Sequence, residues 1–100
     1  MMNQVILVGR ITSDVKDNNV TIAVNRSFKN ADGVYETDFI SIELFGAIGQ
    51  NMAEYCKKGD IIGVKGRLQT KNSEDGKLIT YIVAEKVTFL SSRKNEEEEK

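Results

Sequence analysis

The side chains with the most evident chemical potential are two phenylalanines at the ends of a strand-like segment, residues 39–45. Successive side chains of a β-strand point to opposite faces, so alternate residues share a face. Three aliphatic residues form one face of this segment: Ile40, Ile42 and Leu44. We expect that face to lie against a core. Phe39 and Phe45 then share the polar face, where they leave apolar area exposed unless something covers it.

Aromatic rings on an open sheet face are suited to binding unpaired nucleic-acid bases. Every base has a π-face, so stacking tolerates any sequence and contributes roughly 1–3 kcal/mol per base. Phe28 is a third candidate, because two cations, Arg26 and Lys29, flank it beside a polar loop. The residues alone leave alternatives open. Phe39 and Phe45 could be covered by a loop, a helix or a partner subunit, and Phe28 could be a core plug.

Basic side chains on the predicted strands and turns are candidates for phosphate contacts, because Lys and Arg supply the electrostatic part of nucleic-acid affinity. The candidates are Arg10, Arg26, Lys29, Lys58, Lys65, Arg67 and Lys71. Lys65 and Arg67 are predicted to share one strand face, and Lys71 to open the loop after it. Cations on strand faces also serve solubility, so each residue by itself supports either interpretation.

The composition of the chain provides few side chains for catalysis. The chain has no histidine and a single cysteine, Cys56. Ser–His and Cys–His nucleophile pairs are therefore excluded, and the usual Cys/His zinc sets cannot be assembled. We expect no enzyme, no metal and no other cofactor. A lone cysteine gives no internal disulfide and no apolar run is long enough to span a bilayer, so the expected location is the cytoplasm.

These residues must be positioned by a small barrel, because the hydrophobic pattern is that of strands with one helix. Alternation and turn residues predict strands at residues 4–11, 20–25, 35–45, 61–68 and 78–90. Gly63 and Gly66 indicate a bulge or a tight corner. The order favours an all-β, five-stranded OB-fold barrel with one short α-helix between strands 3 and 4. Another small five-stranded barrel would share much of this pattern.

The one predicted helix covers residues 47–58. Its apolar stripe is expected to comprise Ile48, Met52, Tyr55 and Cys56. Lys57 and Lys58 in the last turn, followed by Gly59, are typical of a helix end.

The length of 100 residues suits one domain. The net charge is -1, but four of the 15 acidic residues are consecutive glutamates at positions 96–99. We therefore expect a folded, mildly positive domain at residues 1–90 and a disordered acidic tail at residues 91–100. This charge distribution is compatible with DNA binding in a groove, but it does not by itself predict DNA binding.

Several motifs resemble bacterial-type single-stranded DNA-binding proteins (SSB). They are NQVILVGR at residues 3–10, AVNRSF at 23–28, TDFI at 37–40, LFG at 44–46, KKGD at 57–60 and VKGRLQT at 64–70. They occur in the family's order. The resemblance implies an OB fold, usually a homotetramer with a dimer as the other possibility, around which single-stranded DNA wraps during replication, recombination and repair. It places the family's base-stacking aromatics at Phe28, Phe39 and Phe45.

The sequence also departs from the family pattern. A fourth aromatic is replaced at about Ser73, the segment 14–19 is short, and Ile40 stands where relatives carry histidine. The acidic-hydrophobic tip that recruits other proteins is lacking, so such recruitment is doubtful and a short form of phage or mobile-element type is indicated. Two other functions stay open: a primosomal-type OB accessory protein, and an interaction module that buries the same aromatic face against a partner.

Overall fold

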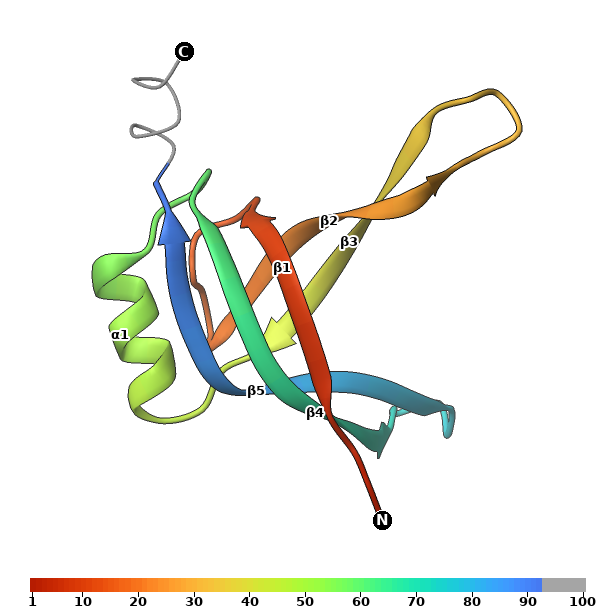
Figure 1. The fold of residues 1–100 in the computed structure, drawn as a ribbon. Helices are drawn as coiled ribbons and strands as arrows, with labels where there is room; N and C mark the ends of the chain where they lie inside the picture. Colours follow the sequence, from red (N-terminus) through yellow and green to blue (C-terminus); the bar gives the residue numbers. More distant parts are fainter. Residues whose placement is uncertain (93–100) are drawn as a thin grey trace.

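The chain folds into a closed five-stranded barrel from which two long hairpins project, as the computed structural model shows (Figure 1). The structure describes residues 1–92. Its elements are β1 (Val5–Ile11), β2 (Asn19–Lys29), β3 (Tyr35–Glu43), α1 (Ala47–Tyr55), β4 (Ile61–Asn72) and β5 (Leu78–Ser91). The strand order around the barrel is β1-β2-β3-β5-β4, and β4 pairs again with β1. The predicted barrel, with its helix between strands 3 and 4, is confirmed.

Neighbouring strands pair antiparallel, except that β3 and β5 run parallel. The parallel contact is short, with Ile42 opposite Ile82 and Glu43 opposite Val83. Beyond it the two strands diverge, so the β2–β3 hairpin and the β4–β5 hairpin leave the barrel in different directions (Figure 1). The two hairpins form a fork whose base is the contact between β3 and β5.

The core lies between the inner faces of the strands and α1. Its buried side chains are almost all aliphatic: Ile11, Val20, Ile22, Ile42, Leu44, Met52, Ile62, Val64 and Ala84. Full burial of one large aliphatic side chain contributes about 1.5–3 kcal/mol relative to exposure. Because inward and outward residues alternate along each strand, this core also fixes which side chains the barrel displays outside.

A tight corner in β4 depends on Gly66. A Cβ atom at this position would lie 2.3 Å from the carbonyl oxygen of Val83 on β5. At the same place the register changes, from Lys65 opposite Lys86 to Gly66 opposite Ala84. The bulge predicted from the glycines is confirmed, and β5 supplies its extra residue.

α1 is shorter than the sequence predicts. It ends at Tyr55, and the next residue, Cys56, is already extended, so Lys57 and Lys58 follow the helix and do not close its last turn. The cause is a contact made by the loop: a carboxylate oxygen of Asp60 accepts the backbone N–H of Lys57 at 2.8 Å. This hydrogen bond favours the loop conformation over another helical turn.

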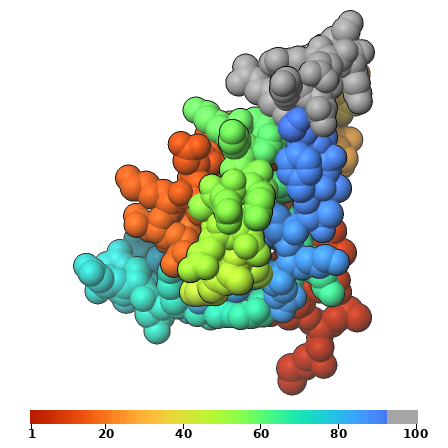
Figure 2. Space-filling view, turned by 90° about the vertical axis from the view of Figure 1, so that its left-hand side faces the viewer, coloured from red at the N-terminus to blue at the C-terminus, as the bar shows by residue number. Residues whose placement is uncertain are grey.

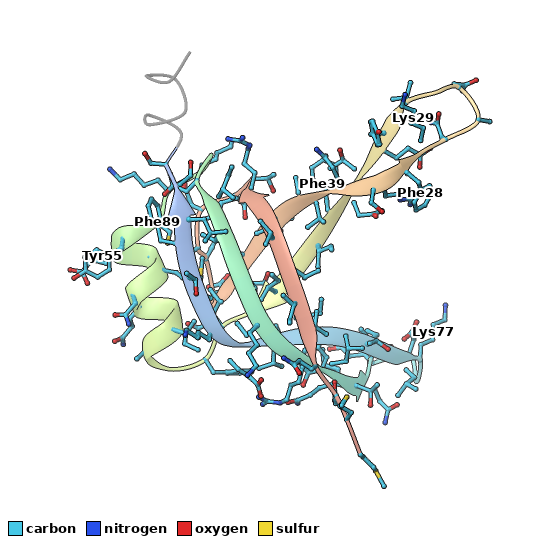
Figure 3. The ribbon with its side chains drawn as sticks, viewed as in Figure 1. Phe28, Lys29, Phe39, Tyr55, Lys77 and Phe89 are labelled. Atoms are coloured by element: carbon cyan, nitrogen blue, oxygen red, sulfur yellow. The ribbon has the colours of Figure 1, made fainter. Side chains whose placement is uncertain are left out.

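The helix lies beside β5 on the face shown in Figure 2. Ile48 and Cys56 pack against the core, and Met52 belongs to it, as predicted. Tyr55 lines one recess with Ile48, Met52 and Cys56, so the predicted stripe is confirmed, although the Tyr55 ring is 71% exposed. It is the last residue of α1, and Figure 3 shows its ring pointing away from the barrel. No helix within residues 1–92 has the length and apolar character needed to cross a membrane.

Both projecting hairpins are longer than predicted. β2 continues to Lys29 and β4 to Asn72, while β3 stops at Glu43. Lys71, expected to open a loop, is paired with Ile79 inside the β4–β5 hairpin. Periodicity missed these extensions because hairpin residues beyond the barrel face solvent on both sides and so lack a regular alternation.

The folded body extends slightly past the predicted domain boundary. β5 runs to Ser91, the first residue of the predicted tail. The rest of that tail, from residue 93 onward, lies outside the described residues, so the acidic tail stays a prediction.

Candidate nucleic-acid interface

The outer face of β3 displays the two phenylalanines expected there. Phe39 is 68% exposed and Phe45, just beyond the strand, is 55% exposed. Ile42 and Leu44, at alternate positions, are buried in the core. The predicted orientation of this segment is confirmed, and no loop or helix within residues 1–92 covers the two rings.

A row of paired residues places Arg10 on the same outer surface as Phe39. Arg10 of β1 is opposite Ala23 of β2, and Ala23 is opposite Phe39 of β3. The two backbones are thus about 10 Å apart, two strand spacings. The guanidinium of Arg10 donates a hydrogen bond to the carbonyl oxygen of Gly59 at 2.8 Å. It therefore lies toward the end of the barrel, where it lines a shallow recess with Lys58.

At the base of the fork, three side chains from different strands meet. The ammonium of Lys71 lies 3.0 Å from a carboxylate oxygen of Glu43. The same ammonium lies 4.5 Å from the centroid of the Tyr81 ring. These residues line a recess together with Ser41, which is two positions from Phe39 along β3. Lys71 is therefore beside the phenylalanine face, as a phosphate contact would require.

Arg67 completes this outer surface from β4. Arg67 is opposite Val83 of β5, and Val83 is opposite Glu43 of β3, so these three residues form one row across the strands. Its guanidinium donates to the side chain of Gln69 at 2.6 Å and forms an ion pair with Glu85 at 3.3 Å. We call this outer surface the β3 surface; it comprises Arg10, Phe39, Glu43, Arg67, Lys71 and Tyr81.

Two members of the β3 surface were not predicted from the sequence, Glu43 and the aromatic residue Tyr81. The hydroxyl of Tyr81 accepts a hydrogen bond from the side-chain amide of Gln69 at 3.0 Å. A signal for it existed in the turn around Gly76, whose backbone φ is 81°. Counting outward from that turn pairs Lys71 with Ile79 and Gln69 with Tyr81, which places the tyrosine beside the lysine. Placing Tyr81 beside Lys71 requires the hairpin register, which composition alone does not give.

Phe28 lies on the β2–β3 hairpin away from the β3 surface. It is 64% exposed, so it is not a core plug. Figure 3 shows Phe28 and Lys29 on opposite sides of the hairpin. Lys29 lies over Tyr35, with its ammonium 5.7 Å from the ring centroid. Alternation along β3 puts Tyr35 and Phe39 on one side, and therefore Phe28 on the other.

Arg26 shares the hairpin with Phe28 and is held by two carboxylates. Its guanidinium makes two bonds to Asp38, both at 3.0 Å, and one to Glu36 at 2.7 Å. The hydrogen bond and charge of Asp38 raise the pKa of Arg26, and the hydrogen bond from Arg26 lowers the pKa of Asp38. Both partners are thus held in their charged forms. In this geometry Arg26 supports the hairpin more directly than it offers a charge to a phosphate.

Lys65 shares the outer face of β4 with Arg67, as predicted, but belongs to another row of paired residues. It is opposite Ile6 of β1 and Lys86 of β5. β3 pairs with β5 only at Ile82 and Val83, so no β3 residue falls in the row of Lys65. The structure therefore brings Arg10, Phe39, Arg67 and Lys71 onto one surface, places Arg26 and Phe28 on the other side of the β2–β3 hairpin, and leaves Lys65 beyond Arg67 along β4.

The family can now be assigned from the whole chain. The model of the single-strand binding protein family matches residues 2–90. The chain belongs to this family. The resemblance seen in the sequence motifs is thereby confirmed, whereas the contribution of each single residue stays a prediction.

Relatives in the single-strand binding protein family match almost the full length of this chain. Single-stranded DNA-binding protein 3 of Listeria innocua is 46% identical over 108 residues, covering 95% of this chain and 68% of the relative. Single-stranded DNA-binding protein B of Bacillus subtilis is 39% identical over 109 residues, covering 96% of both chains.

Solved structures of the family share the fold. A Plasmodium falciparum SSB in complex with ssDNA has a TM-score of 0.72 at 21% identity, over 91% of this chain and 96% of that one. The single-stranded DNA-binding protein of Thermus aquaticus has a TM-score of 0.75 at 23% identity, over 93% of this chain and 52% of that one. This chain thus spans about half the length of the Thermus aquaticus protein.

Proposed function

We propose that this protein binds single-stranded DNA with little regard to sequence, by stacking bases on exposed phenylalanines and by contacting phosphates with nearby cations. The observation that carries the proposal is Phe39, which points outward with Arg10 on one side of it and Lys71 on the other. A ring that shares a surface with cations provides both contacts that an unpaired strand needs. The names of the Listeria innocua and Bacillus subtilis relatives support this ligand.

The experiment is fluorescence anisotropy of a labelled oligo-dT, beside a duplex of equal length, at low and moderate salt. We expect tight binding of oligo-dT and weak binding of the duplex. The logarithm of the affinity should fall linearly with the logarithm of the salt concentration, by about 0.7 for each phosphate neutralised. Absence of oligo-dT binding at low salt would refute the proposal.

The proposal extends to self-association, with a homotetramer as the favoured form. Among the described residues, β1 pairs with β2 only at Arg10 and Ile11. The preceding residues of β1, from Val5 onward, therefore present an open strand edge on the side of β2. The outer face of the same strand carries Ile6, 70% exposed, and Val8, 55% exposed. Open strand edges and exposed apolar patches are usually covered in native proteins. A second copy of the chain would cover both.

The wider role that we propose is protection of single strands in DNA replication, recombination and repair, in the cytoplasm and without catalysis. Two observations support the non-enzymatic part. The sequence lacks histidine, and no cluster of three or more potential metal ligands occurs within residues 1–92. Membership of the single-strand binding protein family does not favour the primosomal-type or interaction-module alternatives.

A further inference from the structure

We infer that Tyr81, Lys71 and Glu43 form an additional nucleotide subsite at the base of the fork. In this subsite the Tyr81 ring stacks on a base, Lys71 contacts a phosphate, and Glu43 holds Lys71 while no strand is bound. The inference rests on the proposed function, because its ligand is the same single strand. It centres on a ring that neither the phenylalanine pattern nor the family's aromatic positions indicate.

The Tyr81 ring has a fixed position. Tyr81 is paired with Gln69 across the hairpin, and its hydroxyl is bonded to the Gln69 side chain at 3.0 Å. One edge of the ring is therefore anchored, which lowers the conformational entropy that stacking on a base would cost. The Lys71 ammonium covers the ring at 4.5 Å from its centroid. The ring is partly exposed, and the lysine that covers it is a flexible side chain.

The proposed subsite is continuous with the rest of the β3 surface. The recess that contains Tyr81 and Lys71 also contains Ser41 of β3. Ser41 and Phe39 share the outer face and lie about 7 Å apart along the strand. A single strand that stacks on Phe39 and continues along β3 toward α1 therefore reaches this recess.

Glu43 places a carboxylate on a surface that should receive a polyanion. The side chain of Glu43 is only 24% exposed, whereas that of Lys71 is 52% exposed. Glu43 is thus fixed, and Lys71 is the partner that is free to move. A phosphate would compete with Glu43 for the lysine, and the departure of Lys71 would uncover the ring for a base. The ion pair therefore acts as a counter-charge that single-stranded DNA must displace.

Charge exchange of this kind has a measurable consequence. Glu43→Gln keeps the size of the side chain and removes the competing charge, so oligo-dT affinity at low salt should rise. Because Lys71 is then available without displacement, we also expect the salt dependence to become steeper, by up to about 0.7 in the log–log slope. Glu54→Gln is the matched control, since it removes the same charge from an exposed position of α1, outside the β3 surface.

The direct experiment uses tyrosine emission, which is possible because the chain has three tyrosines and no tryptophan. The double variant Tyr35→Phe, Tyr55→Phe leaves Tyr81 as the single emitting residue. Both replaced residues keep an aromatic ring, and both are exposed, so the fold should be retained. We expect oligo-dT to quench the Tyr81 emission with the same titration curve that anisotropy of the labelled oligonucleotide gives.

Affinity provides a second measurement in the otherwise unmodified chain. Tyr81→Leu removes the ring, and Tyr81→Phe keeps it while losing only the bond to Gln69. Loss of one stacked base corresponds to a fivefold or greater decrease in affinity, so the Leu variant should bind oligo-dT at least about fivefold more weakly than the Phe variant. Thermal unfolding of both variants shows that they are folded when compared.

The outcomes separate this inference from the proposed function. If the single-tyrosine protein fails to bind oligo-dT at low salt, the proposed function is wrong. If it binds and Tyr81 emission does not change, or if the Leu and Phe variants bind equally, binding stands and the subsite is refuted. Quenching together with a weaker Leu variant supports the subsite.

Discussion

At the level of single residues, Phe39 in β3 and Phe45 just after it lie outside the core cluster of this chain. Phe39 and Phe45 are more than half exposed, while their neighbours Ile42 and Leu44 are fully buried. Their removal should therefore leave the folding free energy almost unchanged. A substitution at either position separates binding from stability, which a core residue cannot do.

The double variant Phe39→Ala, Phe45→Ala should bind oligo-dT much more weakly than the wild type. Each lost stacking contact is worth roughly 1–3 kcal/mol, so the affinity should fall by at least tenfold, as measured by anisotropy at fixed salt. Tyr55→Ala is the matched control, because it removes an equally exposed ring from the end of α1. Equal affinities for the double variant and this control would contradict the stacking surface.

At the level of elements, the β2–β3 hairpin projects from the barrel and has little core of its own. Beyond Val24 its side chains are exposed or half-exposed. The contacts that join its strands there include the bonds from Arg26 to Glu36 and Asp38. A bidentate arginine–carboxylate pair fixes geometry as well as charge, so this cluster is suited to hold Phe28 and Phe39 in place.

This ion pair should make the hairpin sensitive to acid. The pKa of Asp38 is lowered, chiefly by the hydrogen bond from Arg26. A lowered folded-state pKa stabilises the hairpin above the unfolded value of about 4, and the contribution is lost as the pH falls through the folded value. We expect NMR signals of residues 25–29 to change with a midpoint below pH 4 in the wild type.

In Asp38→Asn this transition should be absent. Asp32→Asn is the control, because it removes the same charge from the tip of the same hairpin and leaves both partners of Arg26 intact. A transition that persists in Asp38→Asn, or one centred above pH 4 in the wild type, would show that the ion pair does not hold the hairpin.

The corner of β4 gives a second prediction at this scale. Gly66→Ala would bring a Cβ atom to 2.3 Å from the Val83 carbonyl oxygen, which forces β4 and β5 apart. We expect a loss of about 1–3 kcal/mol or more in the free energy of unfolding, measured with denaturant. At Gly63 the closest atom would be 3.7 Å away, so Gly63→Ala should be tolerated. Equal stabilities of the two variants would contradict the close approach.

At the level of the whole molecule, the barrel presents two different exposed surfaces. The β3 surface combines rings with charges, whereas the outer face of β1 combines Ile6 and Val8 with an open strand edge. The first suits an unpaired nucleic acid and the second suits another copy of the chain. The proposed DNA binding and the proposed self-association therefore use different sides of one small domain.

Ile6→Lys should weaken self-association, because it places a charge in the apolar part of the proposed contact. Light scattering should give a tetramer for the wild type and a smaller species for the variant. Leu78→Lys is the control, since Leu78 is as exposed as Ile6 (69% and 70%). It lies away from β1, at the tip of the β4–β5 hairpin. A monomeric wild type, or a variant that remains tetrameric, would refute the proposed contact.

The sequence by itself determined the barrel and the orientation of its most informative strand. The alternation of Ile40, Ile42 and Leu44 with Ser41 and Glu43 was enough to orient Phe39 and Phe45, since a strand whose one face is buried has only one register that buries it. The absence of histidine likewise excludes the Ser–His and Cys–His catalytic pairs whatever the fold, because no arrangement of strands can supply a missing side chain.

Only the tertiary structure decided which distant residues meet. Lys71 of β4 and Glu43 of β3 are 28 positions apart. They pair because β5 lies between their strands and pairs with both. Tyr81 joins them through the hairpin register, and Arg26 is drawn to two acids on the opposite strand. Local patterns specify which face a residue occupies, but contacts across strands depend on register, bulges and barrel closure, which are fixed only when the whole chain packs.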